Sequence, residues 1–585
     1  MKGFLKTFFA AFVALFVFLL VVLFIGIWLI GRASSEDKPA VGSNGVLVVD
    51  LSTSYADKSK DNTVNSILGD EPSTLPGLYD VIRMIQYAKA DSSIKGIYIK
   101  ADYNNNSFAA TEELRLALTD FKQSKKFVVA YGDVITQGAY SVATIADKIY
   151  CNPKGGVEWK GYATSLLFMK GLLDRLEVQP EVFYAGKFKS ATEPFRYTQM
   201  SDANRLQTSV WMGDLYGHFL QRVAETRKSD TATLHGLATK NLVRRAEDAL
   251  QYKLVDGLKY DDEVKSELFK LMNSKETEKL NFVSLNKYFK AADFRDADGE
   301  KIAVIYAEGE IVDGKGEDGQ IGSTTFKNLV RKARFDKNIK AIVVRVNSPG
   351  GSALASEVIW REIAVARTAK PVVISMGDVA ASGGYYMSCN GDSIYADATT
   401  ITGSIGVFSL AFNVSSFFKN KLGLTFDGVK TAPSADMEFG VRPLTEIEKT
   451  LMQNDVDSIY YTFTLRVAEG RKKPIAYIDS IAQGRVWTGS RALELGLVDK
   501  IGNLKDAIAC AARMSKLKEY HIKEYPERKS FLEQLMSGSS EKSLKAKMMS
   551  EEIGAEEYNL LQKMKKIKTW GDAPQARLPF EYTTN

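Results

Sequence analysis

The sequence predicts an α/β protein whose body consists of two tandem domains with mostly parallel strands. One observation is an internal repeat at an offset of 245 residues, which pairs segment 94–100 with 339–345 and segment 132–134 with 377–379. A second is that short β-branched apolar runs alternate with helix-like stretches in both halves. Such runs are typical of parallel strands that are buried on both faces and joined by crossover helices.

The N-terminal segment Phe8–Ile30 is predicted to be a transmembrane helix. Its 23 residues carry no charge, and a helix of that length spans a bilayer core of about 30 Å. A cleavable signal peptide would have a shorter apolar run and a small-residue cleavage site, which the following residues do not provide. Lys2 and Lys6 precede the run, so the positive-inside rule makes 1–32 a cytoplasmic tip and single-pass anchor. We expect the body on the periplasmic (extracytoplasmic) side of the inner membrane.

After a linker at 33–44, the two domains are expected at 45–290 and 300–520. The opening strand of each half is followed by two further strands, and a helix is expected over 355–368. The expected strands lie at 46–51, 94–100 and 127–131 in the first half and at 302–306, 339–346 and 372–376 in the second.

A charge-rich C-terminal extension is expected at 521–585. Apolar residues at helical spacing within 541–568 predict an amphipathic helix there.

The 77 basic and 71 acidic residues of the whole chain leave a net charge of only +6. A body so close to neutral lacks the basic footprint of a nucleic-acid-binding protein, so we expect no nucleic-acid partner.

The two halves differ in a loop where a strand meets a helix. In the second half this loop reads Asn-Ser-Pro-Gly-Gly-Ser at 347–352, and its paired glycines, Gly350 and Gly351, let backbone N–H groups approach a ligand oxygen closely. The first half has Asn-Asn-Asn-Ser at 104–107. We therefore expect only the second half to keep this backbone cradle.

The halves also differ at a position that follows the next strand. Ser382 lies in an Ala-Ala-Ser-Gly-Gly-Tyr segment, whereas Gln137 occupies the matching position of the first half. A serine at the start of a helix has an accessible hydroxyl and lies where the helix dipole favours negative charge. Ser382 is thus a candidate nucleophile, although an ordinary helix-capping serine fits the same pattern.

The general base cannot be chosen by proximity in sequence. The chain has only three histidines, and none lies within 130 residues of Ser382. A lysine can act as the base if burial lowers its pKa.

The three cysteines are scattered, so we expect neither a disulfide framework nor a metal site, and no cofactor is implied.

Five motifs in order resemble the signal-peptide-peptidase family of serine peptidases, in its long tandem form with an N-terminal anchor. They lie at 347–352, 380–385, 402–406, 483–489 and 496–499. The resemblance extends over most of the chain. It implies two tandem superhelical domains similar to those of Clp protease and crotonase.

The resemblance also implies catalytic residues. It assigns Ser382 as the nucleophile and Lys189, in the Lys-Ser-Ala-Thr-Glu-Pro segment of the first half, as the general base. Lys430 and Lys187 remain alternative bases. Gly350, Gly351 and Gly383 are expected to supply the oxyanion hole. Ser404 is expected to orient the lysine amine.

By resemblance, the chain is expected to be a membrane-anchored endopeptidase that degrades cleaved signal peptides and other apolar peptides, and to form a homotetramer. One alternative is a crotonase-like enzyme acting on acyl-thioesters, which would use the glycine loop but not Ser382. A Clp-type Ser-His-Asp peptidase needs a positioned imidazole, which the scarcity of histidine disfavours. A non-catalytic membrane scaffold is the third alternative.

Overall fold

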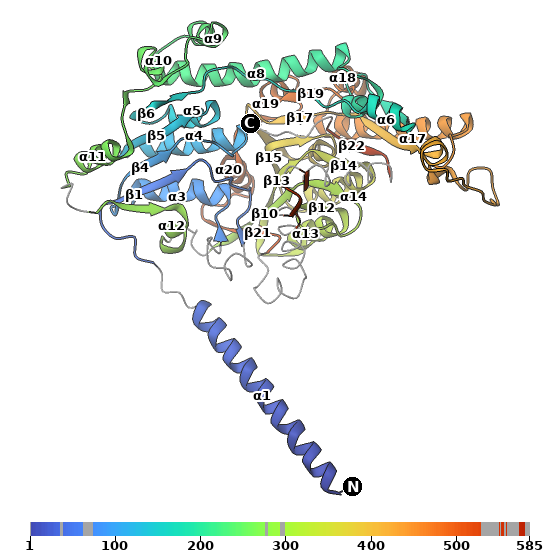
Figure 1. Cartoon of the computed structure of the whole chain (residues 1–585), viewed down its shortest axis with the longest axis horizontal. Coiled ribbons are helices and arrows are strands. Elements are labelled where there is room, and N and C mark those ends of the chain that lie inside the picture. Colours follow the sequence, from blue (N-terminus) through green and yellow to red (C-terminus); the bar gives the residue numbers. More distant parts are fainter. Residues whose placement is uncertain are drawn as a thin grey trace.

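The computed structural model describes residues 2–34, 39–61, 74–274, 279–292 and 299–527. Near the C-terminus it also describes 549, 552–554, 557–558 and 573–578. Two α/β halves lie side by side, and a long N-terminal helix projects away from them (Figure 1). The predicted helix within 541–568 lies almost wholly outside the described residues.

The first half is built on a six-stranded parallel sheet with the order β8-β6-β5-β4-β1-β9. Its strands are β1 (Gly45–Asp50), β4 (Ile94–Lys100), β5 (Phe127–Ile135), β6 (Lys148–Val157), β8 (Gly257–Leu258) and β9 (Asn281–Ser284). Its helices are α3 (Leu78–Ala90), α4 (Phe108–Lys122), α5 (Gln137–Ala143), α6 (Lys170–Leu176), α7 (Glu193–Arg196), α8 (Asp202–Arg227), α9 (Thr231–Thr239), α10 (Ala246–Gln251), α11 (Asp261–Leu271) and α12 (Leu285–Ala291).

The second half repeats this topology. Its strands β20, β16, β15, β13, β10 and β21 pair in parallel in the same order as β8 to β9 of the first sheet. They are β10 (Glu300–Glu308), β13 (Ile339–Ser348), β15 (Val372–Ala381), β16 (Ser393–Ala396), β20 (Lys500–Ile501) and β21 (Tyr520–Tyr525). Beyond β15, the sheet continues through β17 (Ile401–Gly403) and β19 (Val486–Thr488).

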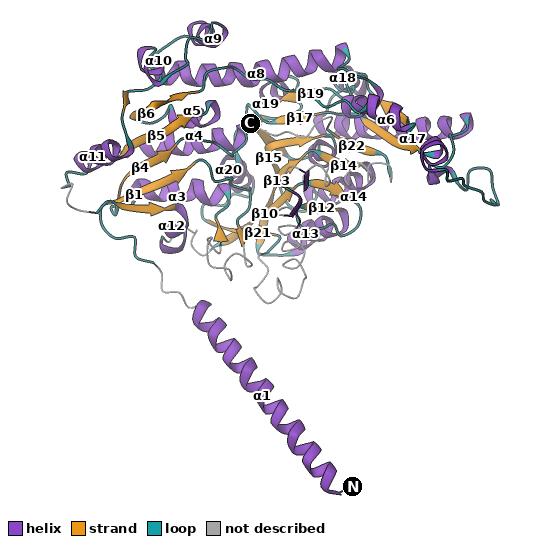
Figure 2. Ribbon diagram, in the orientation of Figure 1, coloured by secondary structure: helices purple, strands orange, loops and turns teal. Residues whose placement is uncertain are grey.

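The helices of the second half cover both faces of its sheet (Figure 2). The longer of them are α13 (Ser323–Phe335), α14 (Ala353–Arg367), α15 (Gly383–Ser388), α17 (Glu446–Arg471), α18 (Ile475–Ile481), α19 (Gly489–Glu494) and α20 (Leu504–Met514). As a result, neighbouring residues of one strand are buried in different cores: Val344 packs in one apolar cluster and Val343 in another. These parallel sheets confirm the predicted α/β class, and the six expected strands and the helix at 355–368 are all present to within a few residues.

A third sheet joins the two halves. Its order is β12-β11-β14-β22-β18-β7, and β7 is its only strand from the first half among the described residues. The strands are β7 (Gln179–Ala185), β11 (Glu310–Val312), β12 (Gln320–Gly322), β14 (Gly350–Ser352), β18 (Val407–Asn413) and β22 (Gln575–Arg577). β7 pairs antiparallel with β18 along its whole length. This pairing holds a segment of the first half beside the second.

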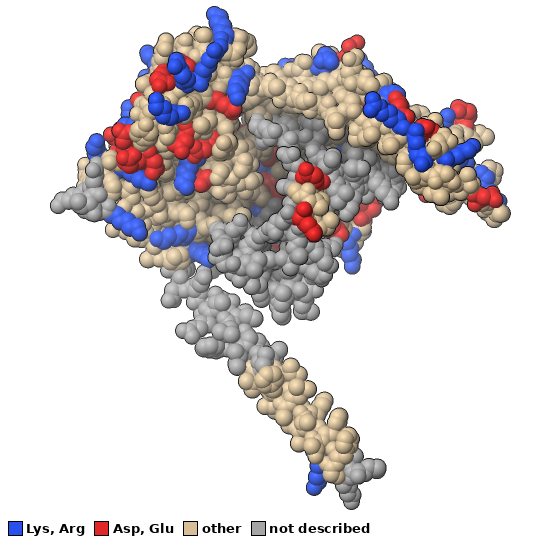
Figure 3. All heavy atoms as spheres, viewed as in Figure 1, with Lys and Arg blue, Asp and Glu red and all other residues tan. Residues whose placement is uncertain are grey.

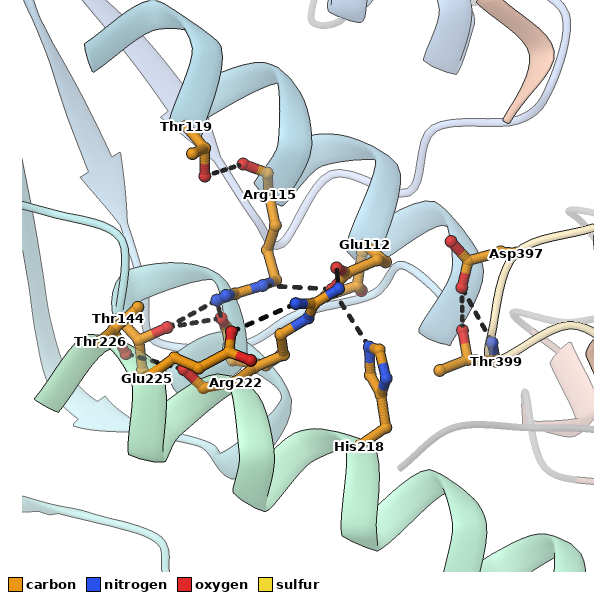
Figure 4. A network of polar contacts seen from close by, with 12 residues as sticks. Glu112, Arg115, Thr119, Thr144, His218, Arg222, Glu225, Thr226, Asp397 and Thr399 are labelled. Carbon is orange, nitrogen blue, oxygen red and sulfur yellow. Dashed lines mark hydrogen bonds and ion pairs between the residues drawn. The ribbon is translucent and has the colours of Figure 1, made fainter. Parts of the chain in front are cut away.

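Helix α8 bridges the halves as well (Figure 1). Near its middle, Asp214 accepts hydrogen bonds from Arg491 (2.8 Å) and Thr488 (3.0 Å) of the second half. Towards its C-terminal end, Arg222 lies 2.7 Å from the buried carboxylate of Glu112 on α4. Figure 4 shows Arg222 and His218 of α8 both pointing at this carboxylate. One rigid element is thus fastened to both halves.

A buried arginine makes a further bridge. Arg345 on β13 is 2% exposed, and its guanidinium lies 2.9 Å from Asp57 and 2.7 Å from Glu113, both of the first half. Buried charges of this kind must be paired, because an unpaired one is strongly destabilising. The halves are therefore fixed relative to each other by specific contacts.

The N-terminal helix α1 covers Lys2–Ser34. Among the residues that the structure describes, however, no helix is both long and apolar enough to cross a membrane. The predicted transmembrane span at Phe8–Ile30 is therefore not confirmed.

Candidate active site

Ser382 lies at the sharp turn between strand β15 and helix α15. Its backbone has φ 54° and ψ −115°, an unfavourable conformation for a residue with a side chain, which costs about 1–3 kcal/mol. The turn is held by two hydrogen bonds, from Ser382 N to Gly403 O (2.8 Å) and from Tyr386 N to Ser382 O (2.7 Å). As the sequence predicted, the serine ends a strand and starts a helix.

Lys189 of the first half reaches this serine. It follows β7 by four residues, and the pairing of β7 with β18 carries it to the second half. Its Nζ lies 2.7 Å from Ser382 Oγ, and 3.1 Å from both Oγ and the carbonyl oxygen of Ser404. The structure thus brings together three residues that the resemblance singled out, although 193 positions separate the lysine from Ser382.

The electrostatic environment of Lys189 favours a neutral amine. The side chain is only 1% exposed, and the three oxygens around Nζ carry no formal charge. Burial away from water disfavours the ammonium form, so the pKa of Lys189 is lowered well below its usual 10.5. A neutral amine within hydrogen-bonding distance of a serine hydroxyl can accept its proton.

The loop that carries Lys189 is held by Gln207 of α8. Its amide Nε2 donates to Phe188 O (3.0 Å) and to Ser190 Oγ (2.9 Å), the residues on either side of the lysine. Its Oε1 accepts from Val486 N of the second half (3.2 Å). Gln207 escaped the sequence analysis because a single glutamine in a polar helix carries no distinguishing pattern.

Gly484 packs against the same lysine. A side-chain carbon at this position would lie 2.6 Å from Lys189 N, closer than real contacts allow. The sequence signal was present, because Gly484 belongs to the motif at 483–489, but its role could not be inferred before its neighbour was known.

The predicted oxyanion glycines separate into two groups. Gly350, with φ 97°, lies against the turn at Ser382: a side-chain carbon on it would be 2.7 Å from the amide nitrogen of Gly383. Gly351 instead packs against Ile311 of β11, where a side chain would collide with the backbone. Gly350 and Gly383 therefore lie together beside Ser382, whereas Gly351 allows the close approach of two strands.

The two alternative bases lie elsewhere. Lys430 is exposed and pairs with Asp436 at 3.1 Å. Lys187 is exposed and lies over the ring of Phe188, 5.1 Å from its centre. Lys189 is the one of the three whose amine contacts Ser382.

The equivalent site of the first half is filled by a glutamine. Gln137 starts α5 as Ser382 precedes α15, and its Oε1 accepts from the backbone N–H groups of Lys160 (2.9 Å) and Gly161 (3.1 Å). The side chain is thus used to fasten a loop.

Within the part of the chain that the structure describes, no cluster of three or more potential metal ligands occurs in either half.

Comparison with known proteins agrees with this duplicated architecture. The profile of peptidase family S49 matches the chain twice, at residues 120–275 and 364–518. The chain belongs to peptidase family S49. The two matches confirm the internal repeat, and the S49 family makes the protein a serine peptidase.

Three relatives match most of this chain. Protease 4 of Salmonella typhi is 38% identical over 88% of this chain and 85% of its own length. Protease 4 of Haemophilus influenzae is 33% identical over 81% and 80%, respectively. The chloroplastic serine protease SPPA of Arabidopsis thaliana is 30% identical over 74% of this chain and 64% of its own.

Proposed function

We propose that this S49 peptidase is a membrane-anchored endopeptidase in which Ser382 and Lys189 form the catalytic dyad. The observation that carries the proposal is the 2.7 Å distance between Lys189 Nζ and Ser382 Oγ, across the junction of the two halves. In this division, domain 45–290 supplies the base and domain 300–520 supplies the nucleophile.

The proposed reaction starts with the neutral amine of Lys189 accepting the proton of Ser382 Oγ. The oxygen attacks the carbonyl carbon of the scissile peptide bond and forms a tetrahedral oxyanion. Backbone N–H groups at Gly383 and Gly350 stabilise it; one such donor contributes about 3–4 kcal/mol in other proteases. The ammonium of Lys189 then protonates the leaving amine, and water hydrolyses the acyl-enzyme by the same route in reverse.

Ser404 is assigned a positioning role in this mechanism. Its hydroxyl and its carbonyl oxygen both lie 3.1 Å from Lys189 Nζ. Two fixed acceptors restrict the rotation of a long flexible side chain and direct the third hydrogen-bonding position of the amine at Ser382.

Mutagenesis with active-site labelling tests the dyad. A serine-reactive fluorophosphonate should label Ser382 in the natural protein, and both labelling and peptide hydrolysis should be lost in Ser382→Ala and Lys189→Ala. Lys187→Ala is the matched control, since it removes an exposed lysine two residues away, and it should stay active. Full activity in Lys189→Ala would overturn the assignment.

The proposed substrates are cleaved signal peptides and other extended apolar peptides that remain in or near the inner membrane. The N-terminal helix supports this. The consecutive residues from Phe16 to Val21 are all at least 39% exposed, and six consecutive residues cover the full circumference of a helix. Lys2 and Lys6 precede the apolar run and Arg32 follows it, and Figure 3 shows blue only near the tip of the coloured part of this helix. A helix that is apolar all round is stable in a bilayer, with the body on the periplasmic side.

Extraction with alkaline carbonate tests the anchor. The full chain should remain in the membrane pellet, and a variant that lacks residues 1–44 should appear in the supernatant. Release of the full chain by carbonate would refute the proposed anchor.

A homotetramer is proposed for the assembled enzyme. An exposed apolar segment of the second half supports it: Leu422, Leu424, Phe426, Val429 and Phe439 are all more than half exposed. Clusters of this kind mark protein contacts. Light scattering should give the mass of four chains for the natural protein and a smaller mass for Phe426→Asp. A monomeric natural protein would contradict the proposal.

A further inference from the structure

The residues immediately before strand β19 hold both the loop of Lys189 and the loop of Ser404. Gln483 O accepts a hydrogen bond from the N–H of Phe188 (2.8 Å), the residue that precedes the lysine. Arg485 O accepts one from the N–H of Ser404 (2.7 Å). The backbone of this short segment therefore fixes the proposed base relative to the serine that orients it.

The side chain of Arg485 contacts two buried aromatic rings. Its guanidinium carbon lies 4.9 Å from the centre of the Phe188 ring and 4.3 Å from that of the Trp487 ring. Phe188 belongs to the first half and is 7% exposed, whereas Trp487 belongs to the second and is 8% exposed. The indole N–H of Trp487 donates to Ile481 O (3.0 Å), which fixes this ring. One side chain thus joins the loop of the base to a fixed ring of the other half.

The two rings are what holds this guanidinium. Within the described residues, its Nε is buried without a hydrogen-bond partner. Burial, followed by the charge of Arg491, lowers the pKa of Arg485, so no described carboxylate offsets its charge. Arg491 itself pairs with Asp214, and Lys187 lies over the same Phe188 ring. A planar, weakly hydrated guanidinium suits such a place, because it stacks on aromatic faces without full hydrogen bonding.

We propose that Arg485 is a positioning residue that keeps Lys189 covered by holding Phe188 in place. The inference rests on the proposed dyad of Lys189 and Ser382. Without the guanidinium, Phe188 loses the contact that ties its ring to the second half, and the adjoining lysine amine becomes accessible to water. A hydrated amine keeps its proton at higher pH. A smaller fraction of the enzyme then holds the neutral base that the reaction requires.

The pH dependence of kcat for Arg485→Met tests this role. The acid limb of the profile should move up by about one pH unit, which is a loss of about tenfold in kcat on that limb, whereas KM should change little. Activity should return at higher pH, because the amine can still lose its proton there. Arg334→Met is the matched control: this arginine also lies over a phenylalanine ring of the second half, that of Phe335 at 4.5 Å, and its loss should leave the profile unchanged.

A double variant tests whether Arg485 acts through Phe188. Phe188→Leu should shift the acid limb in the same direction. Arg485→Met combined with Phe188→Leu should shift it no further than the larger of the two single effects, because both changes remove the same contact. An acid limb that stays in place in Arg485→Met, or shifts that add in the double variant, would overturn the proposal.

Chemical modification separates this inference from the proposed dyad. In the Ser382→Ala background, reductive methylation of Lys189 is followed by peptide mapping. Arg485→Met should raise its rate at least about tenfold, with the exposed Lys187 as the internal reference. The increase should appear even if Lys189 is not the base. Equal rates with and without Arg485 would refute the positioning role even if Ser382 and Lys189 prove to be the dyad.

Discussion

Replacing Lys189 by methionine should stabilise the protein at neutral pH while abolishing its activity. To act as a base at pH 7.5, Lys189 must be neutral in the folded protein, whereas in the unfolded chain its pKa is 10.5. Removing the proton at pH 7.5 therefore costs about 4 kcal/mol of folding free energy, because each pH unit below 10.5 adds about 1.4 kcal/mol. Methionine has a similar shape and carries no proton to remove.

The lost hydrogen bonds oppose this gain. Methionine leaves the buried oxygens of Ser382 and Ser404 without the amine, at a cost of about 1–3 kcal/mol. The net effect at pH 7.5 is a stabilisation of about 1–3 kcal/mol. Since the folded pKa is depressed, the folded state binds fewer protons than the unfolded state, and the stability of the natural protein rises with pH up to about 10.5. At pH 10 the cost of deprotonation falls below about 1 kcal/mol, so the advantage of methionine should disappear or reverse.

Urea unfolding of the detergent-solubilised proteins at pH 7.5 and pH 10 measures this change. The difference in unfolding free energy between Lys189→Met and the natural protein should shift by about 3 kcal/mol between the two conditions. Lys187→Met is the matched control, because its exposed amine should give no pH-dependent difference. A difference for Lys189→Met that is the same at both pH values would refute a neutral buried lysine.

Three further predictions concern the surroundings of the dyad. Gly484→Ala should lower kcat by at least tenfold with little effect on expression, because its methyl group would displace the backbone of Lys189. Gln207→Ala should reduce kcat with little change in KM and shift the pH–rate profile, because only the amide donates to both neighbours of the lysine. Gln207→Glu keeps the size of the side chain but loses this donor, so it should not restore activity. An unchanged profile would mean that Gln207 is merely structural. Arg345→Met should lower the unfolding free energy by about 3–5 kcal/mol in urea titrations, because two buried carboxylates lose their partner; a loss below 1 kcal/mol would contradict this.

The sequence was sufficient to mark Ser382 as a candidate nucleophile because the chain contains its own comparison. The repeat aligned Ser382 with Gln137, and the apolar runs predicted where each strand would end. Hydrophobic pattern is a local property, and β15 and its turn to α15 are formed by residues adjacent in sequence. The α/β class, the parallel strands and the turn at Ser382 could therefore be predicted.

The partners of Ser382 could not be derived in the same way. Lys189 lies 193 residues away, and only the pairing of β7 with β18 brings it close; resemblance suggested it, whereas no local pattern did. Strand β22 was not anticipated at all. Gln-Ala-Arg has no strand pattern of its own, and its conformation is imposed by the two edges between which it lies.

The proposed catalytic centre lies at the junction between the halves, and this ties activity to the closure of that junction. A lysine amine loses its charge only where water is excluded, so the pKa of Lys189 is depressed only while the second half covers it. If β7 separates from β18, the amine regains both water and its proton, and it can no longer accept the proton of Ser382. The seven paired positions of β7 and β18, the bridging helix α8 and the buried Arg345 oppose this separation. Protonation of the amine itself favours the open state. Mild acidification should therefore abolish activity before the sheets of either half unfold. If the halves folded independently and the lysine were exposed, loss of activity would not precede loss of structure in this way.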